Sequence, residues 1–170
     1  MSKAYLLGVM HDSTERKNTF RISSKENSYT KFLAEMIHKM GHKAWTYREG
    51  KTRDMYIVEF SKKVVNNINI STTKDKIDYI RGYFDAEGSV PKSKNVRFYI
   101  YFSQKDKGDL DQLKSYITEL GIKCGKTHNP SKNIDPNYWR FYICSKSYND
   151  FIDLIGSLHP VKSKLLRMKI

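Results

Sequence analysis

The 170-residue sequence predicts an α+β protein made of two similar halves. Three observations lead to this prediction. Four segments of the first half recur in the same order in the second half, one of them is in both halves an amphipathic helix that stops at a glycine, and the predicted strands alternate apolar with polar residues as half-buried strands do. Each half is therefore expected to run helix, strand or hairpin, helix, hairpin, helix.

The first recurring segment is a helix that carries a glycine. Residues 78–88 place apolar side chains at i, i+3 and i+4 with Gly82 on the same helix, and the start of the chain resembles them around Gly8. A glycine inside a helix lowers its stability by about 1 kcal/mol relative to alanine, so we expect a second helix backbone to pass very close. Glu87 lies at the helix end, a good place to bind a metal, and Gly88 is expected to turn the chain. The alternative is an ordinary amphipathic helix followed by a turn.

Two strands and a helix recur in each half after this first helix. They are residues 20–26, 32–43 and 55–62 in the first half, and residues 100–106, 112–123 and 141–146 in the second. Both helices stop at a glycine, Gly41 or Gly121, which is the residue that most often caps a helix C-terminus.

The two halves differ in length. Only residues 13–18 separate the first helix of the first half from its next strand, whereas the second half has room for a full hairpin with its turn at residues 91–95. The boundary falls in the polar segment 66–74, whose Ser-Thr-Thr is a candidate helix N-cap. We therefore divide the chain into residues 1–70, a shortened first half, and residues 71–170.

The predicted strands of the second half have two different faces. One face would carry Val96, Phe98, Ile100 and Phe102 on the first strand and Trp139, Phe141 and Ile143 on the second. The other face would carry Asn95, Arg97, Tyr99, Tyr101 and Ser103, and then Tyr138, Arg140 and Tyr142. Any half-exposed sheet has a polar face, but a face rich in Arg and Tyr favours a sheet that contacts DNA bases.

The charge of the chain indicates the kind of partner. Lys and Arg number 31 against 18 Asp and Glu, a net charge of +13, which favours nucleic acid over an acidic membrane surface. No apolar run approaches the roughly 20 residues of a membrane span, and the start of the chain leaves no room for a signal peptide. We expect an intracellular protein, cytoplasmic or organellar and not secreted. Cys124 and Cys144 are expected to be reduced thiols, and the five histidines show no zinc spacing.

The segments Leu6–Thr14 and Ile80–Gly88 resemble the two motifs of a LAGLIDADG homing endonuclease, the first in degenerate form. The order of elements around them is similar to that of compact single-chain members encoded in introns or inteins. The resemblance implies two αββαββα repeats with pseudo-two-fold symmetry, the motif helices packed at the centre and two antiparallel sheets straddling DNA. It also implies hydrolysis of both strands at a long recognition site, dependent on Mg²⁺ (or Mn²⁺), by a monomer that acts as a pseudo-dimer.

The resemblance also implies which residues carry the chemistry. Glu87 occupies the metal-binding acid position of the second motif, where a carboxylate could hold Mg²⁺ beside the scissile phosphate. In the first motif the strict count gives Ser13, but serine is a poor ligand, and we predict its neighbour Asp12 as the second metal-binding acid. Gln104 matches a residue that orients water, and Lys162 a lysine near the active site.

Several of these assignments have neighbours or counterparts. Lys164 lies close enough to Lys162 in sequence to compete with it, Ser24 is the first-half counterpart of Gln104, and Lys74 or Lys76 is the first-half counterpart of Lys162 by position. The candidate DNA-binding residues are basic, polar or aromatic and lie on the predicted sheet faces and loops. They are Arg21, Arg48, Lys51, Arg53, Lys92, Lys94, Asn95, Arg97, Tyr99, Tyr101, Lys126, Lys132, Tyr138, Arg140 and Tyr142.

Two other functions are compatible with the sequence. A LAGLIDADG-type protein without cleavage activity could act as a maturase for intron RNA or as a DNA-binding regulator, and a protein in which Asp12 does not reach the metal would nick one strand. A basic ribosome-associated protein is disfavoured by the duplication. A homodimer would leave the first half without a purpose.

Overall fold

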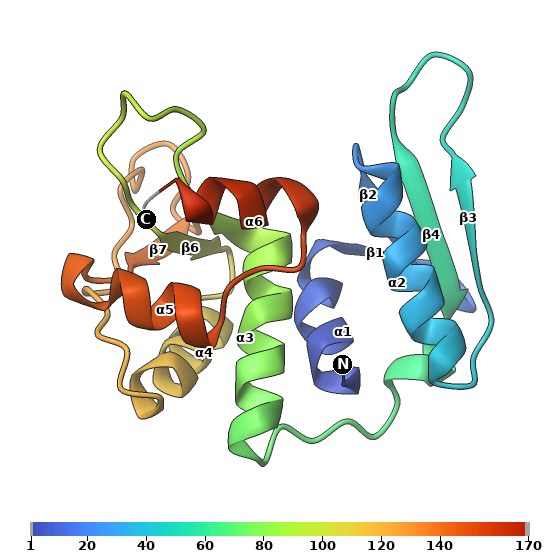
Figure 1. The fold of residues 1–170 in the computed structure, drawn as a ribbon, viewed down its shortest axis with the longest axis horizontal. Helices are drawn as coiled ribbons and strands as arrows, with labels where there is room; N and C mark the ends of the chain where they lie inside the picture. The colour runs from blue at the N-terminus through green and yellow to red at the C-terminus, as the bar shows by residue number, and fades with distance from the viewer. Residues whose placement is uncertain (1, 169–170) are drawn as a thin grey trace.

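Two helices that touch along their backbones form the centre of the computed structural model, which describes residues 2–168 (Figure 1). They are α1 (Lys3–Val9) and α3 (Thr73–Glu87). A Cβ atom built on Gly8 would lie 2.2 Å from the carbonyl oxygen of Tyr79, and one built on Gly82 would lie 2.0 Å from that of Tyr5. Only glycine fits at either position, which confirms the close helix contact expected from the sequence.

The first half folds into a four-stranded antiparallel sheet covered by one helix. The chain continues from α1 through a short 3₁₀ helix, η1, and the sheet has the order β1-β2-β4-β3. Its elements are η1 (Met10–Asp12), β1 (Ser13–Glu15), β2 (Thr19–Ser24), α2 (Asn27–Lys39), β3 (Ala44–Arg48), β4 (Tyr56–Ser61) and the 3₁₀ helix η2 (Lys62–Val65). Leu33 and Ile37 of α2 pack with Tyr5, Leu6 and Val9 of α1 in one buried core.

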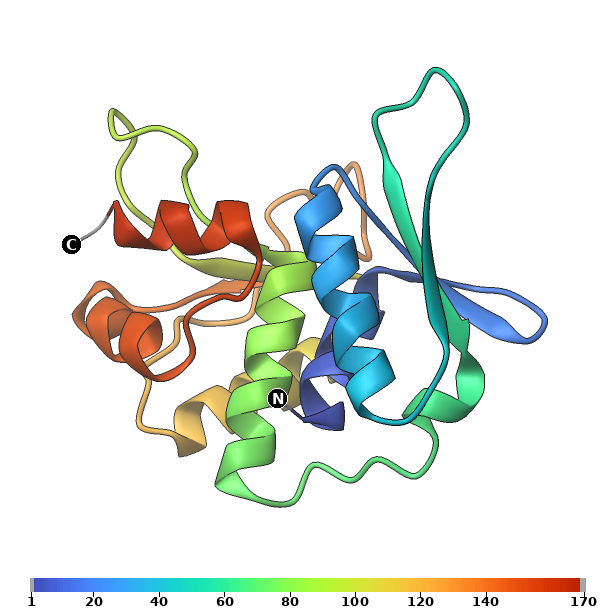
Figure 2. The same cartoon turned by 45° about the vertical axis from the view of Figure 1, so that its right-hand side comes forward.

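The second half has a three-stranded antiparallel sheet with the order β5-β6-β7 and a larger set of helices. Its elements after α3 are β5 (Gly88–Ser89), β6 (Tyr101–Gln104), α4 (Lys107–Glu119), β7 (Trp139–Tyr142), the 3₁₀ helix η3 (Ser145–Ser147), α5 (Tyr148–Leu154) and α6 (Pro160–Arg167). Tyr83 and Phe84 of α3 belong to a second core that also holds Phe102, Phe141 and Phe151. Figure 2 shows the two sheets on either side of the central helices.

The shorter half has the more complete sheet, which reverses the expectation from loop lengths. In the first half a hydrogen bond from the Arg16 N–H to the Thr19 carbonyl (2.9 Å) closes a tight turn between β1 and β2. In the second half the predicted strand over residues 95–103 begins only at Tyr101, and β5 has two residues. Val96, expected on the core face, is 52% exposed. Pro91 lacks an N–H and follows β5 closely, so the hairpin pairs only at its base.

Helix ends follow the local sequence in most cases. Gly41 and Gly121 both have φ +82°, the left-handed conformation expected at a helix C-terminus. Gly88 does not, since its φ is −73°; the Phe84 ring would lie 2.0 Å from a Cβ built at this position. Gly88 therefore makes room for Phe84 and does not supply a left-handed turn. The predicted last helix of the first half is only the short η2.

Residues 66–71 connect the halves. Thr72 then caps α3, accepting from the N–H of Asp75 (3.1 Å) while the Asp75 carboxylate accepts from the N–H of Thr72 (3.1 Å), a complete capping box. The cap predicted from Ser-Thr-Thr is confirmed, and the division at residue 70 stays a prediction. Among residues 2–168 no helix has both the length and the apolar character needed to cross a membrane.

Candidate active site at the tips of the central helices

Two carboxylates meet where the central helices end. Asp12 is the last residue of η1 and is exposed, and Glu87 is the last residue of α3 and is half-buried. Burial raises the pKa of Glu87, and the negative charge of Asp12 raises it further. Although Asp12 as a residue is exposed, partial desolvation of its carboxylate raises its pKa, while the positive charge of Lys162 opposes that rise. The two acids are therefore close enough to repel each other.

The first motif is one residue shorter from glycine to acid than the second motif. The 3₁₀ helix η1 explains how Asp12 still reaches this position. Five α-helical steps from Gly82 to Glu87 rise about 7.5 Å, and one α step followed by three 3₁₀ steps from Gly8 to Asp12 also rise about 7.5 Å. Each 3₁₀ step turns about 120° around the helix axis, whereas an α step turns about 100°. Counted from its own motif glycine, Asp12 therefore comes within about 40° of the angle that Glu87 has from Gly82, whereas four α steps would leave it about 100° away. The shorter motif thus places its acid at nearly the same height and angle as the longer one.

Lys162 caps the end of α3. Helix α6 crosses the tip of α3 in Figure 1, and the Lys162 ammonium donates to the carbonyl oxygens of Phe84 (2.8 Å), Asp85 (2.8 Å) and Ala86 (3.2 Å). Burial lowers the pKa of Lys162 to about 8, although the carboxylates of Asp85, Glu87 and Asp12 act in the opposite direction. A cation here is favoured by the negative end of the helix dipole.

Lys162 also shares a cavity with Asp12. The two residues help to line a space of about 150 Å³ between the first-motif tip and α6. Lys164, the competing candidate, is exposed and makes no contact of this kind. The structure thus brings together three of the four predicted catalytic residues: Asp12, Glu87 and Lys162.

Asp85 holds the segment before α6 and was missed by the sequence reasoning. Its carboxylate accepts from the Tyr5 hydroxyl (2.6 Å), the Ser157 hydroxyl and the backbone N–H groups of Leu158 (3.0 Å) and His159 (3.2 Å). Burial raises the pKa of Asp85, and the hydrogen bonds from Ser157 and Tyr5 oppose that rise. The signal in the sequence was a carboxylate between apolar residues near the end of a buried helix.

Gln104 lies apart from this group. It ends β6, where its side-chain oxygen accepts from the Lys105 N–H (2.7 Å) and its amide lies beside the Tyr83 hydroxyl. Among the described contacts none joins Gln104 to Asp12, Glu87 or Lys162. Its role in orienting water stays a prediction.

Among the described residues of the first half none is a counterpart of Lys162, and the assignment of Lys74 or Lys76 is wrong. Both lie in the first turn of α3, about 17–20 Å along the helix from Glu87. Lys74 is exposed, and Lys76 forms an ion pair with Glu119. The reason is topological: Lys162 sits on α6, and the first half ends in η2 with no helix that crosses the tip of α1.

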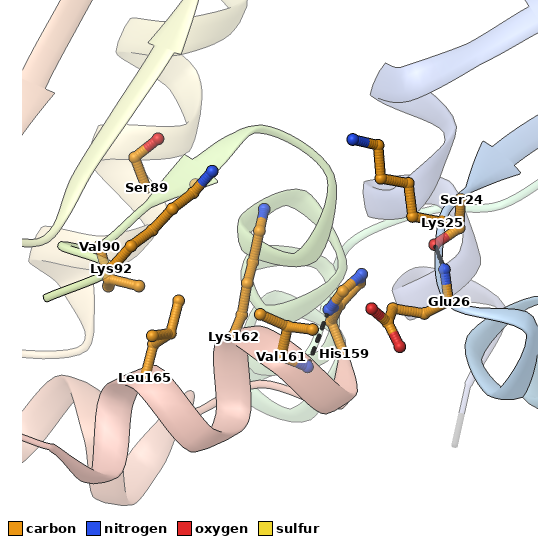
Figure 3. A pocket seen from close by; sticks show the side chains of 11 residues that line it. Ser24, Lys25, Glu26, Ser89, Val90, Lys92, His159, Val161, Lys162 and Leu165 are labelled. Atoms are coloured by element: carbon orange, nitrogen blue, oxygen red, sulfur yellow. Dashed lines mark hydrogen bonds between the residues drawn. The ribbon is translucent and has the colours of Figure 1, made fainter. Parts of the chain in front are cut away.

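A pocket of about 350 Å³ opens beside the helix tips (Figure 3). Lys25 of the first half faces Lys92 and Lys162 of the second across it, and Ser24 and His159 also line it. Lysines from both halves therefore line one recess close to Glu87, together with Glu26 and apolar side chains, and their positive charge suits a phosphate group.

The carboxylate pair fits a hard divalent ion. Carboxylate oxygens are the ligands that Mg²⁺ and Mn²⁺ prefer, and Mg²⁺ at phosphoryl sites typically uses one or two carboxylates, with the remaining ligands supplied by water and phosphate. Within residues 2–168 no cluster of three or more His, Cys, Asp and Glu side chains is placed to hold a metal by itself. Asp12 and Glu87 would hold the ion, and a cation between them would relieve the repulsion that raises the pKa of Glu87.

The second-half sheet presents an aromatic surface with one arginine at its centre. The Arg140 guanidinium carbon lies 5.5 Å from the Tyr101 ring centroid and 5.2 Å from that of Tyr142, and Tyr99 packs 5.6 Å from Tyr101. The buried Nε atom of Arg140 has no hydrogen-bond partner among the described residues. Packed against these rings, Arg140 has an oriented guanidinium, although its Nε atom is shielded by the protein.

Three of the four first-half candidates, the arginines, are paired with acids. Arg21 forms an ion pair with Glu49, Arg53 lies 3.7 Å from the same carboxylate, and Arg48 lies 3.6 Å from Asp54. The remaining basic and polar candidates are exposed, and Tyr138 is half-buried. The exposed ones are Lys51, Lys92, Lys94, Asn95, Arg97, Lys126 and Lys132.

Comparison with known proteins identifies relatives of this arrangement. Residues 74–156 match the sequence model of a family described as the LAGLIDADG-like domain. The homing endonuclease I-ApeI of Aeropyrum pernix is 37% identical over 93 residues, which cover 54% of this chain and 39% of that protein. The structure of I-DmoI in complex with DNA and Ca superposes with a TM-score of 0.69 at 19% identity, over 97% of this chain and 96% of that chain.

A second solved structure has a similar fold. The N-terminal LAGLIDADG domain of DUF199/WhiA superposes with a TM-score of 0.69 at 13% identity, over 91% of this chain and 80% of that chain. The family match falls on the second half, which has the better motif, whereas the structural matches extend over both halves. The match to I-ApeI spans about two fifths of the length of that relative. Residues 74–156 thus match the LAGLIDADG-like domain, and, with two motif helices at the centre and a sheet on each side, the whole chain has the fold of these solved structures.

Proposed function

We propose that this protein is a site-specific DNA endonuclease that hydrolyses both strands of a long target site with Mg²⁺ or Mn²⁺. The observation that carries the proposal is the meeting of Asp12 and Glu87 at the tips of two helices that touch at Gly8 and Gly82. I-ApeI is named a homing endonuclease, and I-DmoI has been solved with DNA and with Mn, Mg and Ca, which supports both a DNA substrate and a divalent ion.

Each residue of the site has a task in this proposal. Asp12 and Glu87 would hold the divalent ion, which when bound neutralises charge at the scissile phosphate and lowers the pKa of bound water. Lys162, whose pKa is lowered to about 8, carries its charge beside the carboxylates and can exchange a proton near neutral pH. Lys25 and Lys92 line the adjacent pocket and would contact phosphates on either side of the cleaved bond.

DNA recognition is assigned mainly to the second half. Its sheet holds the Arg140 guanidinium against Tyr101 and Tyr142, and arginine is the side chain that most often contacts guanine edges. Exposed lysines on the loops, such as Lys126 and Lys132, would neutralise the phosphate backbone. In the first half, Arg21 would have to leave Glu49 to contact DNA.

Cleavage of a randomised duplex library with Mg²⁺, followed by sequencing of the ends, tests the proposal. We expect ends from one family of sites with 3′ overhangs, and we expect Glu87→Gln and Asp12→Asn each to remove double-strand cleavage. Nicking of one strand that survives Asp12→Asn would mean that the first motif is not catalytic.

The second candidate function is binding without cleavage, as a DNA-binding protein or a maturase that contacts intron RNA. It is favoured by one observation, namely that the acid of the first motif stands one residue away from the position of Glu87 in the second. Tight binding to selected duplexes with no cut in Mg²⁺ or Mn²⁺ would support this candidate in place of the first.

A further inference from the structure

Each motif tip contacts the opposite half through a residue at the same position of the motif, but the two residues differ in chemistry. Asp85 stands three residues after Gly82, and His11 stands three residues after Gly8. Asp85 accepts from the hydroxyl of Tyr5 on α1 (2.6 Å), which in turn lies 2.9 Å from the hydroxyl of Tyr29 on α2. The tip of the second motif is therefore fastened to the first half.

His11 makes the reciprocal contacts. Its Nε2 atom lies 2.9 Å from the hydroxyl of Tyr79 on α3, and its Nδ1 atom lies 3.4 Å from a carboxylate oxygen of Asp109 on α4. Tyr79 and Tyr5 each stand three residues before their motif glycine, and Asp109 and Tyr29 are each the third residue of their helix. Equivalent positions therefore supply the partners at both motif tips, although the residues and some of the individual contacts differ.

The imidazole of His11 is held on several sides. The Tyr83 ring lies 4.0 Å from it at an interplanar angle of 35°, and the Tyr79 ring packs edge-on at 5.9 Å. The Tyr83 hydroxyl donates to the same Asp109 oxygen that His11 faces (2.8 Å). His11 is thus fixed within the second half, although it belongs to the first-motif helix.

Asp12 is the next residue, and it is fixed from its other side as well. Ser13 begins β1 and pairs with Ile22 of β2. Asp12 therefore lies between an anchored histidine and the first residue of a strand, and η1 is the short turn that joins them. If the His11 anchor were released, the last turn of the helix could relax toward α geometry and rotate Asp12 by about 60° away from Glu87.

We propose that His11 is a positioning residue that holds η1 in its 3₁₀ form and so aims Asp12 at the metal position. This inference rests on the proposed function for the identity of the metal site. It explains how a motif one residue short can still present its acid, and it assigns a role to the His11, Tyr79 and Asp109 contacts that the catalytic proposal does not use.

Metal binding measured without DNA tests the inference directly. Isothermal titration of the full-length protein with Mn²⁺ would compare wild type, His11→Leu, which keeps apolar bulk between the tyrosines, and His11→Gln, which keeps a polar group near the Nε2 position. Partners that orient a metal ligand typically change metal affinity by 10–100-fold when removed. We expect His11→Leu to weaken Mn²⁺ binding at least about 10-fold, as Asp12→Asn does, and His11→Gln to recover most of the loss.

A remote histidine provides the matched control. The Nε2 atom of His38 lies 2.8 Å from the Ala44 carbonyl oxygen in the first half, away from the helix tips, so His38→Leu removes a comparable hydrogen bond and should leave Mn²⁺ affinity unchanged. Equal Mn²⁺ affinity in wild type and His11→Leu would overturn the inference. An equal loss in His38→Leu would also overturn it, because the effect would then reflect general destabilisation.

Strand-resolved cleavage separates this inference from the proposed function. On a selected target labelled on both strands, His11→Leu should slow cleavage of the strand that Asp12→Asn also slows, by about 10-fold, and should slow the other strand less. Equal slowing of both strands contradicts the positioning role while leaving the endonuclease in place. A wild-type protein that binds Mn²⁺ but cuts no DNA contradicts the endonuclease, and the Mn²⁺ titration then still decides the role of His11.

Discussion

Gly82→Ala is the sharpest test of the contact between α1 and α3, because helix propensity predicts a more stable protein and packing predicts a less stable one. Alanine should stabilise an exposed helix by about 1 kcal/mol relative to glycine. At residue 82, however, the added Cβ would lie 2.0 Å from the Tyr5 carbonyl oxygen, 2.9 Å from its carbon and 3.0 Å from the Val9 nitrogen. Backbone atoms form this obstacle, so no side-chain rotation can relieve it.

The magnitude follows from the displacement required. Restoring an ordinary contact of about 3.4 Å would move α1 and α3 apart by more than 1 Å, and gaps of 0.5–1 Å already remove about a quarter to a half of each dispersion contact across an interface. Overpacking of this kind costs about 3 kcal/mol or more, which leaves a net loss of about 2–3 kcal/mol after the propensity gain. For a chain of this length, that corresponds to a melting temperature lower by roughly 5–10 °C.

Urea unfolding followed by circular dichroism measures this loss. Gly108→Ala is the matched control, because Gly108 lies in α4 and is exposed, and its added Cβ would meet only the Asp106 side chain, at 3.3 Å. We expect the control to be neutral or stabilising. If Gly82→Ala were as stable as Gly108→Ala, the backbone contact between the central helices would be wrong, and with it the placement of Asp12 beside Glu87.

Three further outcomes are expected. Glu87→Gln should raise the free energy of unfolding of the metal-free protein at pH 7 while removing cleavage, because the folded state raises the pKa of this acid and so penalises its charged form above that pKa; equal or lower stability would contradict it. The pKa of Lys162 is lowered to about 8 in the folded state, so keeping its ammonium charged there lowers stability. This loss of stability is fully present below pH 8 and is relieved as the pH rises toward about 10.5, the pKa of the unfolded state. The wild-type free energy of unfolding should therefore rise over that range by up to about 3 kcal/mol, and Lys162→Met should abolish the rise. Arg140→Met should reduce discrimination at a single base pair by about 1–3 kcal/mol in a binding selection, whereas Lys132→Ala should weaken binding to all sequences alike and lower the salt slope by about 1.

Features set by local chemistry were predictable from the sequence. The close approach at Gly8 and Gly82, the left-handed glycine at Gly41 and the capping box at Thr72 each follow from what a residue can do within a few neighbours. The fold followed from the order of the repeated segments, and Glu87 from its place at the end of an apolar helix.

Features set by distant contacts were not predictable in this way. The strand expected at residues 95–100 needed a paired neighbour that β5 is too short to provide. The placement of Asp12 depends on a 3₁₀ turn, and His11 contacts its partners 68 and 98 residues away in the chain, on α3 and α4. Lys74 and Lys76 failed as counterparts of Lys162 because the second half alone carries α6.

Residues 66–71 are the place at which the chain could be cleaved to separate the two halves. This segment joins η2 to the N-terminal end of α3, whereas Asp12, Glu87 and α6 lie at the other end of the central helices (Figure 1). The close contact between the central helices is made at Gly8 and Gly82, outside this segment, although Ile70 of the segment packs against the core of the second half. The rest of the segment thus supplies mainly effective concentration, because it keeps the two halves near each other. Severed there, the chain would become a heterodimer of two fragments whose activity depends on their concentration.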